Sequence, residues 1–460
     1  MQMGSVDVLG GAAVHTTSGF DMPSYLYTTD GLKMLVKHSA DPTKQLDNVQ
    51  LVVCELNSGA YSPELYPLIV SKGGLDLRER REAVQDLWLK DQQTLSGDGT
   101  DGAVSLLSQC FSHLNRTGRI ISLTVFGRTQ GWHSTAEDDQ VWGSKVYISK
   151  LNELEACLDK KAFKDGDCVK VMVKLLEASH DVSAPITSLA LDLQNGHHSF
   201  ASASIGALQK MSDLSGEFLP VLERLDLRLK ISAPADGLDD ISEASSVTMV
   251  ERLSDCETEI SHEATSTFEA TGLGSLLEIL ANDAPQLSRL DLTMCGPAVD
   301  DDAYNLTLDS INKGLGNAYF QEIALHEGRF DALNLQGFLE SHAIGLKTLI
   351  LDNIQLQGTD SWRGSLPWMA ENLTLDALEL HNLTATKWCT KFRCQRTKVL
   401  CGLCGDGAWA SYGYFDGAEK VAEGLEYLVD IATGQYKWLD HLAEGRTKPM
   451  MEEEDSDEEA

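Results

Sequence analysis

The chain has 460 residues, 42% of them hydrophobic, and a net charge of −33 from 70 acidic and 37 basic side chains. Such a charge repels nucleic acid and anionic membrane surfaces, so neither is expected as a partner. No apolar run reaches the roughly 18 residues that a transmembrane helix needs, so no transmembrane helix is expected.

Predicted helices and strands alternate from the first part of the chain. Residues 1–20 are rich in Gly, Ser, Thr and Ala and are expected to be disordered. The elements predicted after them are a helix at 29–38, a strand at 46–56, helices at 77–95 and 103–114, and a strand at 120–125. Thr29 or Asp30 is expected to cap the first helix, because a side-chain oxygen there can accept unpaired N–H groups. In the second helix, Val84, Leu87 and Leu89 are expected to face inward.

The middle of the chain continues the alternation with two interruptions. Residues 127–145 are predicted to form a loop, anchored by Trp132 and Trp142. The elements predicted next are helices at 151–163, 169–180 and 199–211 and strands at 186–191 and 222–227. Residues 233–265 are acidic and rich in Ser, and they are expected to leave the regular pattern as an excursion.

The pattern L-x-x-L-x-L, with some substitutions, recurs in the last third of the chain. It starts at Leu287, Phe320, Leu346 and Leu375, at separations of 33, 26 and 29 residues. One strand and one helix in about 20–29 residues is typical of a leucine-rich repeat. The fold class expected is therefore α/β: an irregular leucine-rich-repeat solenoid, with parallel strands on a concave face and helices on a convex face.

These patterns give four predicted regions. They are a disordered N-terminus (1–20), a solenoid with excursions at 127–145 and 233–265 (21–383), a C-terminal cap (384–445), and a disordered acidic tail (446–460).

The predicted concave face carries many charged side chains. In a strand, alternate residues point to opposite faces, so the residues between the inward leucines line the concave side. The candidate protein-binding residues are Arg224, Asp226, Arg228, Arg289, Asp291, Glu322, His326, Asp352, Glu379 and His381. If the strands stack in register, Arg224 lies beside Arg289 and Asp226 beside Asp291. Two interpretations remain open: a ligand groove of mixed charge, or a solvated sheet whose charges compensate one another.

A cluster of cysteines follows the last repeat. Cys389, Cys394, Cys401 and Cys404 form C-x4-C-x6-C-x2-C, and the second pair resembles one zinc knuckle. A structural zinc ion requires four ligands of this kind in a tetrahedron. The six residues that separate the two cysteine pairs, however, are fewer than the spacing between ligand pairs in zinc fingers. The candidate roles are a zinc site, a redox dithiol, or cysteines with neither function. No cofactor is expected from the rest of the sequence.

The last ten residues, MEEEDSDEEA, contain seven acids. Such a block repels itself and is expected to stay disordered. Ser456 fits the acid-directed S-x-x-E pattern of casein kinase 2, so it is a candidate phosphorylation site.

Two segments carry a resemblance to a known family. TDGLKMLVKHSADPTKQLDNVQLVVCEL, at 29–56, and LWLKDQQTLSGDGTDGAVSLLSQCFSHLNRTGRIISLTV, at 87–125, resemble successive units of fungal F-box/leucine-rich-repeat-type proteins. The resemblance extends over about residues 24–390. It implies the substrate-binding region of such a protein. No F-box is visible before residue 29, so the ubiquitin-ligase adaptor is not expected as a partner.

The sequence favours a non-enzymatic protein. It contains no G-x-S-x-G, H-E-x-x-H or Walker motif, and no G-x-G-x-x-G after a strand. Ten cysteines are too few for a disulfide scaffold and the N-terminus lacks a secretory signal, so a cytoplasmic or nuclear location is expected. The expected function is protein binding by a solenoid related to F-box substrate receptors. The alternative is an acidic-tailed leucine-rich-repeat chaperone or regulator of basic proteins, and an enzyme using Cys401 and Cys404 is the third reading.

Overall fold

The computed structural model describes residues 23–44, 46, 48–56, 66–119, 121–127, 141–142, 163–193, 202–215, 219–231, 271–296, 301–316, 318–357, 361–381, 383–385 and 412–433. The predicted disordered residues 1–20, the excursion at 233–265, the tail at 446–460 and residues 151–162 of a predicted helix lie outside these ranges.

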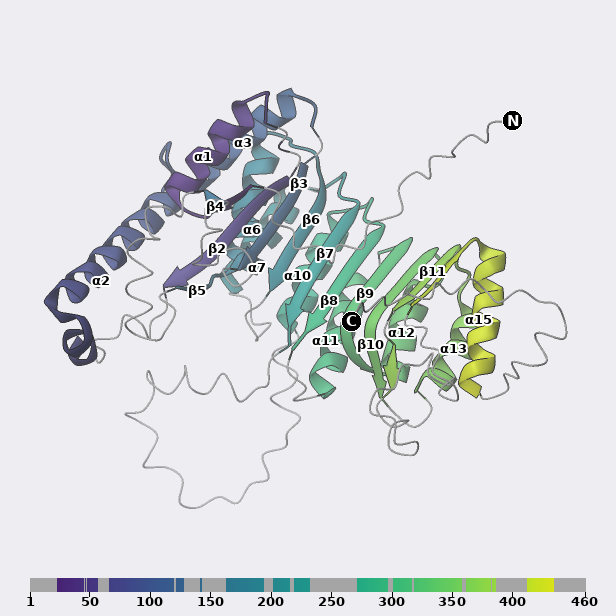
Figure 1. The fold of residues 1–460 in the computed structure, drawn as a ribbon. Coiled ribbons are helices and arrows are strands. Elements are labelled where there is room, and N and C mark those ends of the chain that lie inside the picture. Colours follow the sequence, from purple (N-terminus) through teal and green to yellow (C-terminus); the bar gives the residue numbers. More distant parts are fainter. Residues whose placement is uncertain are drawn as a thin grey trace, which may run out of the picture.

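One large, mostly parallel sheet runs through the described residues (Figure 1). Its strands are β1 (Ser24–Leu26), β2 (Asn48–Leu56), β3 (Ile121–Gly127), β4 (Val141–Trp142), β5 (Phe163–Asp165), β6 (Ile186–Leu193), β7 (Arg224–Lys230), β8 (Arg289–Cys295), β9 (Glu322–Asp331), β10 (Thr348–Gln357), β11 (Ala377–His381), β12 (Thr384–Ala385) and β13 (Tyr412–Asp416). The order across the sheet is β13-β11-β10-β9-β8-β7-β6-β3-β2-β1-β4, with β12 beside β10 and β5 beside β2. Among the strands that the structure describes, only the β11–β13 and β2–β5 pairings are antiparallel.

The helices form a second layer that follows the order of the strands. They are α1 (Thr29–Ala40), α2 (Tyr66–Ser96), α3 (Ala103–Arg116), α6 (Cys168–Asp181), α7 (Ser202–Ser215), α10 (Thr271–Asn282), α11 (Asp301–Leu315), α12 (Ala332–His342), α13 (Ser361–Asn372) and α15 (Ala418–Thr433). Apart from α2, each helix packs on the next along the layer, from α1 through α3, α6, α7 and α10 to α15. Figure 1 shows this layer lying along one face of the sheet. The expected α/β class with parallel strands and connecting helices is confirmed, in a solenoid-like arrangement.

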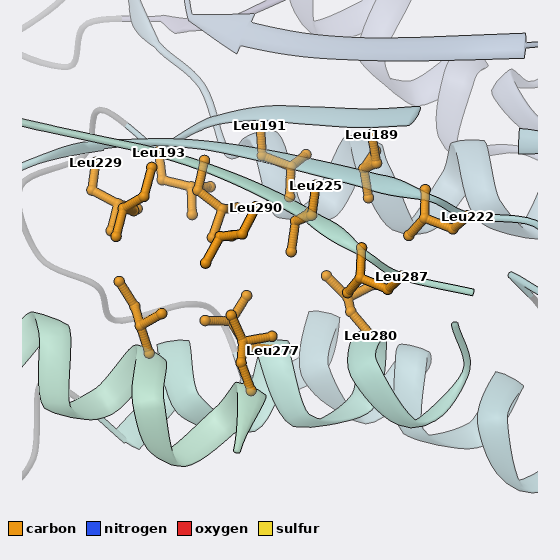
Figure 2. Close-up of a cluster of buried hydrophobic side chains, with 14 of the residues drawn as sticks. Leu189, Leu191, Leu193, Leu222, Leu225, Leu229, Leu277, Leu280, Leu287 and Leu290 are labelled. Carbon is orange, nitrogen blue, oxygen red and sulfur yellow. The ribbon is translucent and has the colours of Figure 1, made fainter. Parts of the chain in front are cut away.

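Columns of leucine hold the two layers together. The parallel register sets Leu227, Leu292, Leu325, Leu351 and Leu380 side by side across five strands. Each of these side chains is at most 1% exposed. Figure 2 shows the strand leucines facing Leu277 and Leu280 of α10. Burying one such side chain stabilises the fold by about 1.5–3 kcal/mol, and no repeat could bury its own column alone.

Helix α2 contacts the first helices of the layer, α1 and α3. It starts at Tyr66, earlier than predicted, and its buried residues include Arg81, Val84 and Trp88. The prediction that Leu89 faces inward is wrong, because Leu89 is 47% exposed. Residues three, four and seven apart share one face of a helix, and this spacing selects Trp88 rather than its neighbour.

The start of α1 differs from the prediction in its capping residue. Thr28 caps the helix by accepting a hydrogen bond from the Gly31 N–H at 3.2 Å. Thr29, one of the expected caps, instead donates its backbone N–H to Asp91 of α2 at 3.1 Å. The carboxylate therefore lies at the positive end of the α1 dipole and ties α2 to α1.

The interval 127–145, predicted as a loop, contains β4. This strand pairs in parallel with β1 and ends on Trp142. The ring of Trp142 meets the buried ring of His38 edge-on, with 4.7 Å between their centroids. The outer edge of β1 thereby gains backbone partners from a segment far away in sequence.

The strands β9 and β10 share an irregularity. Glu327 and Asn353 have positive φ angles of 55° and 56°, and they occupy equivalent positions after the His326–Asp352 register pair. The turn in each strand keeps Phe330 and Leu356 inward after the interruption. Gly328 follows the turn, and a Cβ there would lie 2.3 Å from the Phe330 ring.

The predicted cap at 384–445 is described in part, through β12, β13 and α15. Strand β13 pairs with β11, and α15 packs against α13 as the last helix of the layer. Phe415 and Leu425 are buried in the same core as the leucine columns.

We expect the contact between α10 and α11 to tolerate no side chain at Gly314. A Cβ there would lie 2.5 Å from the Gly274 carbonyl oxygen and 2.8 Å from Leu277 Cβ. Gly314→Ala should lower the free energy of unfolding by about 1–3 kcal/mol, measured by denaturant titration.

Gly337→Ala in α12 is the matched control, because a Cβ at Gly337 meets nothing within 4 Å. It should raise the free energy of unfolding by about 0.4–1 kcal/mol. Equal effects of the two substitutions would contradict the close helix packing.

Candidate functional site

The candidate site is the face of the sheet opposite the helical layer, here called the open face. From β7 to β13 it carries the residues that alternate with the buried leucines, and most of them are half-buried or exposed. Since parallel register aligns equivalent positions, these side chains form rows that cross the strands.

Three rows cross the open face. The first aligns Arg224, Arg289, Glu322, Thr348, Ala377 and Asp416. The second aligns Asp226, Asp291, Ala324, Ile350, Glu379 and Tyr414. The third aligns Arg228, Thr293, His326, Asp352 and His381. All ten predicted binding residues therefore lie in one continuous array, with Arg224 beside Arg289 and Asp226 beside Asp291 as expected.

A network of ionic contacts links β7 to β8. Arg224 Nε donates to Asp226 Oδ1 at 2.6 Å, and Arg224 Nη2 donates to Asp291 Oδ2 at 3.1 Å. Burial raises the pKa of Asp226 more than the Arg224 guanidinium lowers it. Burial acts to lower the pKa of Arg224, but the hydrogen bond to Asp226 and the charges of Asp226, Asp291 and Glu322 outweigh it, so the pKa is raised.

His326 continues the network to β10. Its Nε2 lies 3.5 Å from Asp291 Oδ1, and its Nδ1 lies 3.3 Å from Asp352 Oδ2. Burial acts to lower the pKa of His326 and Arg228 adds to that effect. The hydrogen bond to Asp352 and the charges of Asp291 and Asp352 outweigh both, so the pKa is raised. The protonated ring can donate to both carboxylates at once, which joins three adjacent strands.

The far end of the open face combines acids with the aromatic ring of Tyr414. His381 Nε2 lies 2.7 Å from Glu379 Oε1 on β11. Next to them on β13 are Tyr414, which is 48% exposed, and Asp416, which is also exposed. The pKa of Tyr414 is raised, mainly by burial and further by Asp416 and Glu379.

Tyr414 and Asp416 were missed by the sequence reasoning, which placed them in the C-terminal cap. The alternation of Y-G-Y-F-D is a strand signal that could have revealed β13, but nothing local indicates that it pairs with β11.

Asp192 of β6 is a residue that the sequence pattern places on the open face but that the structure buries. Its place in the pattern predicts the exposed face, whereas its side chain is only 4% exposed.

The remaining predicted site residues lie outside the described ranges. They are Cys389, Cys394, Cys401, Cys404 and Ser456. Across the described ranges, no group of three or more His, Cys, Asp or Glu side chains is placed to hold a metal ion.

The chemistry around His326 is electrostatic. Thr293 lies beside His326 in register and Asp352 lies on its other side, an order that resembles a hydroxyl–histidine–carboxylate relay. Both ring nitrogens of His326, however, face carboxylates. The contacts described for His326 are therefore with carboxylates, not with a hydroxyl nucleophile.

Comparisons with known proteins leave the family open. No protein-family model matches the chain, and no curated protein matches it. Among the helices that the structure describes, none has both the length and the apolar character needed to cross a membrane.

We expect His326 to titrate above the ordinary histidine pKa of about 6.5. Asp352→Asn should lower this pKa, because it replaces a hydrogen-bonded carboxylate by a neutral amide. Histidine-selective NMR across a pH series measures both values, and a His326 midpoint at or below that of a free histidine in the native protein would contradict the assignment.

The same pKa shift predicts the sign of a stability change. Because the folded-state pKa is raised, the His326 contribution is complete below about pH 6.5 and is lost as pH rises through the folded-state pKa. The difference in unfolding free energy between the native protein and His326→Asn should therefore shrink from pH 5.5 to pH 8. Taking the difference removes the opposite effects of His38 and His342, whose pKa values are lowered, mainly by burial.

Proposed function

We propose that the chain is a protein-binding solenoid of the leucine-rich-repeat type, and that its open face is the binding surface. The observation that carries this proposal is the continuous array of mostly polar and charged side chains in register from β7 to β13, on the side opposite the helical layer. Concave faces of solenoids are common binding surfaces. The leucine columns support the leucine-rich-repeat assignment, because they occupy the L-x-x-L-x-L positions.

The shape of the array favours recognition over catalysis. Its side chains are spread along several strands instead of converging in a pocket around a nucleophile. Exposed ion pairs contribute only about 0–1 kcal/mol each to stability. Such charges are better suited to selecting a partner and orienting it, since electrostatic complementarity governs specificity and association rate.

The partner that we propose is a protein, and the process is substrate recognition related to that of F-box ubiquitin-ligase receptors. The resemblance of residues 29–56 and 87–125 supports this process. A cytoplasmic or nuclear location and a non-enzymatic role belong to the same proposal, as does the absence of nucleic-acid and membrane partners.

A second candidate is an acidic regulator or chaperone of basic proteins. The net charge of −33 and the seven acids in the last ten residues favour it. The two candidates differ in what binds: the open face in the first, the acidic tail in the second.

Affinity purification with quantitative mass spectrometry tests the open face. In the test variant, Arg289→Glu is combined with Glu379→Lys, which changes the face but leaves the net charge unaltered. The matched control combines Glu278→Lys with Lys313→Glu at exposed positions of α10 and α11. The amount of each partner recovered with the native protein should fall at least tenfold with the test variant and should be unchanged with the control.

Loss of the same partners from both variants, or from neither, would contradict binding by the open face.

Removal of residues 451–460 tests the second candidate, in which the acidic tail binds the partner. Binding that is unchanged by this truncation and insensitive to salt would exclude the acidic regulator, because exposed charges are screened at high ionic strength.

A further inference from the structure

The open face has an unbalanced charge pattern at β7 and β8. Two like-charge pairs face each other directly, Arg224 with Arg289 and Asp226 with Asp291. Like charges directly opposite on neighbouring strands are destabilising. The structure relieves the repulsion diagonally, because Arg224 binds both aspartates.

This solution leaves Arg289 poorly paired. Its closest carboxylate among the described residues is Glu322, with Arg289 Nε 3.8 Å from Glu322 Oε2. That distance exceeds the 2.7–3.2 Å of a hydrogen bond. The Arg289 side chain is 56% exposed. A guanidinium group carries five N–H donors in a planar fork, so Arg289 presents a site for a carboxylate from outside the chain.

The opposite charge predominates toward β13. At the aligned positions of β9 to β13 the face carries carboxylates and no lysine or arginine; Arg329 lies further along β9, beyond the turn at Glu327. These carboxylates are Glu322, Asp352, Glu379 and Asp416. Asp416 is exposed, and Tyr414 beside it offers an aromatic ring to solvent. A lysine or arginine bound there would gain the exposed Asp416 carboxylate and a cation–π contact with Tyr414, while Glu379, which His381 contacts at 2.7 Å, adds negative charge beside them.

The second row is less polar in the middle of the face. Ala324 and Ile350 lie in register between the two ends, in the same row as Asp291 and Glu379. Ala324 is buried and Ile350 is half-buried, so this part of the row requires no charge from a ligand.

We propose that the open face binds an extended partner segment with segregated charge. An acidic residue of the segment binds Arg289 on β8, and a lysine or arginine binds among Glu379, Asp416 and Tyr414. This inference rests on the proposed binding function and specifies the chemistry of the partner. Four strand spacings of about 4.8 Å separate β8 from β13, so about six extended residues span the two ends.

A second copy of this chain is the less favoured occupant. Two chains that each carry a net charge of −33 repel one another at long range. A short segment of balanced charge approaches the face without that cost. Its carboxylate can also form the paired hydrogen bonds that Glu322 does not make with Arg289.

Selection from a random octapeptide display library on the immobilised full chain tests the inference. The native protein is compared with Arg289→Glu, with Asp416→Lys, and with the Glu278→Lys and Lys313→Glu control. Circular dichroism verifies that each protein is folded. The native protein and the control should enrich peptides with Asp or Glu at one end and Lys or Arg at the other.

Arg289→Glu and Asp416→Lys should each abolish the preference for a charged residue at one end of the peptide. Arg289→Glu should remove the enrichment of acidic residues, and Asp416→Lys that of basic residues. A selected peptide, synthesised with a fluorescent label, should bind each variant at least tenfold more weakly in fluorescence anisotropy.

Three outcomes would overturn the inference. Peptides without charge segregation that are still lost with Arg289→Glu or with Asp416→Lys would leave the binding face in place but refute its charge preference. Peptides unaffected by every open-face variant would refute both the inference and the proposed function. No enriched peptides, together with a dimer in analytical ultracentrifugation that Arg289→Glu dissociates, would identify a second copy as the occupant.

Discussion

The structure depends on burial of the leucine columns between the sheet and the helical layer. Each column gains its contacts from neighbouring strands, so a strand is stable only beside others of the same kind. Leu225, Leu290, Ile323, Leu349 and Leu378 form one such column, with at most 1% exposure each. This constraint fixes the register, since a slip by one residue would turn every leucine to the open face.

Register in turn determines the chemistry of the open face. Once the leucines are aligned inward, the residues between them are aligned outward, whatever their charge. Arg224 is placed against Arg289 for this reason, although the electrostatic interaction between them is unfavourable. The diagonal contacts of Arg224 offset that repulsion within β7 and β8, and His326 extends the network to β10. The charge left over at Arg289 is thus a consequence of packing on the other side of the sheet.

The irregular points of the solenoid-like arrangement have local causes. Glu327 adopts a positive φ, which costs energy for any residue except glycine. Among the other residues the cost is low for asparagine, which occupies the equivalent position at Asn353. The turn is retained in both strands because it returns Phe330 and Leu356 to the core. At the C-terminal end of the sheet, β13 reverses the strand direction and brings Tyr414 and Asp416 beside β11, where they enlarge the open face.

The sequence by itself determined the α/β class, most strands, and the ten charged positions that share one face. These depend on local periodicity: alternation within strands, the recurring L-x-x-L-x-L, and helical spacing between them. The tertiary structure decided what depends on contacts between distant segments. Examples are the capping of α1 by Thr28 with help from Asp91, the pairing of β4 with β1, the burial of Asp192, and the addition of β13 to the open face. Only the three-dimensional register, with its distances, separates the satisfied Arg224 from the exposed Arg289, because their sequence contexts, R-L-D-L in both cases, are the same.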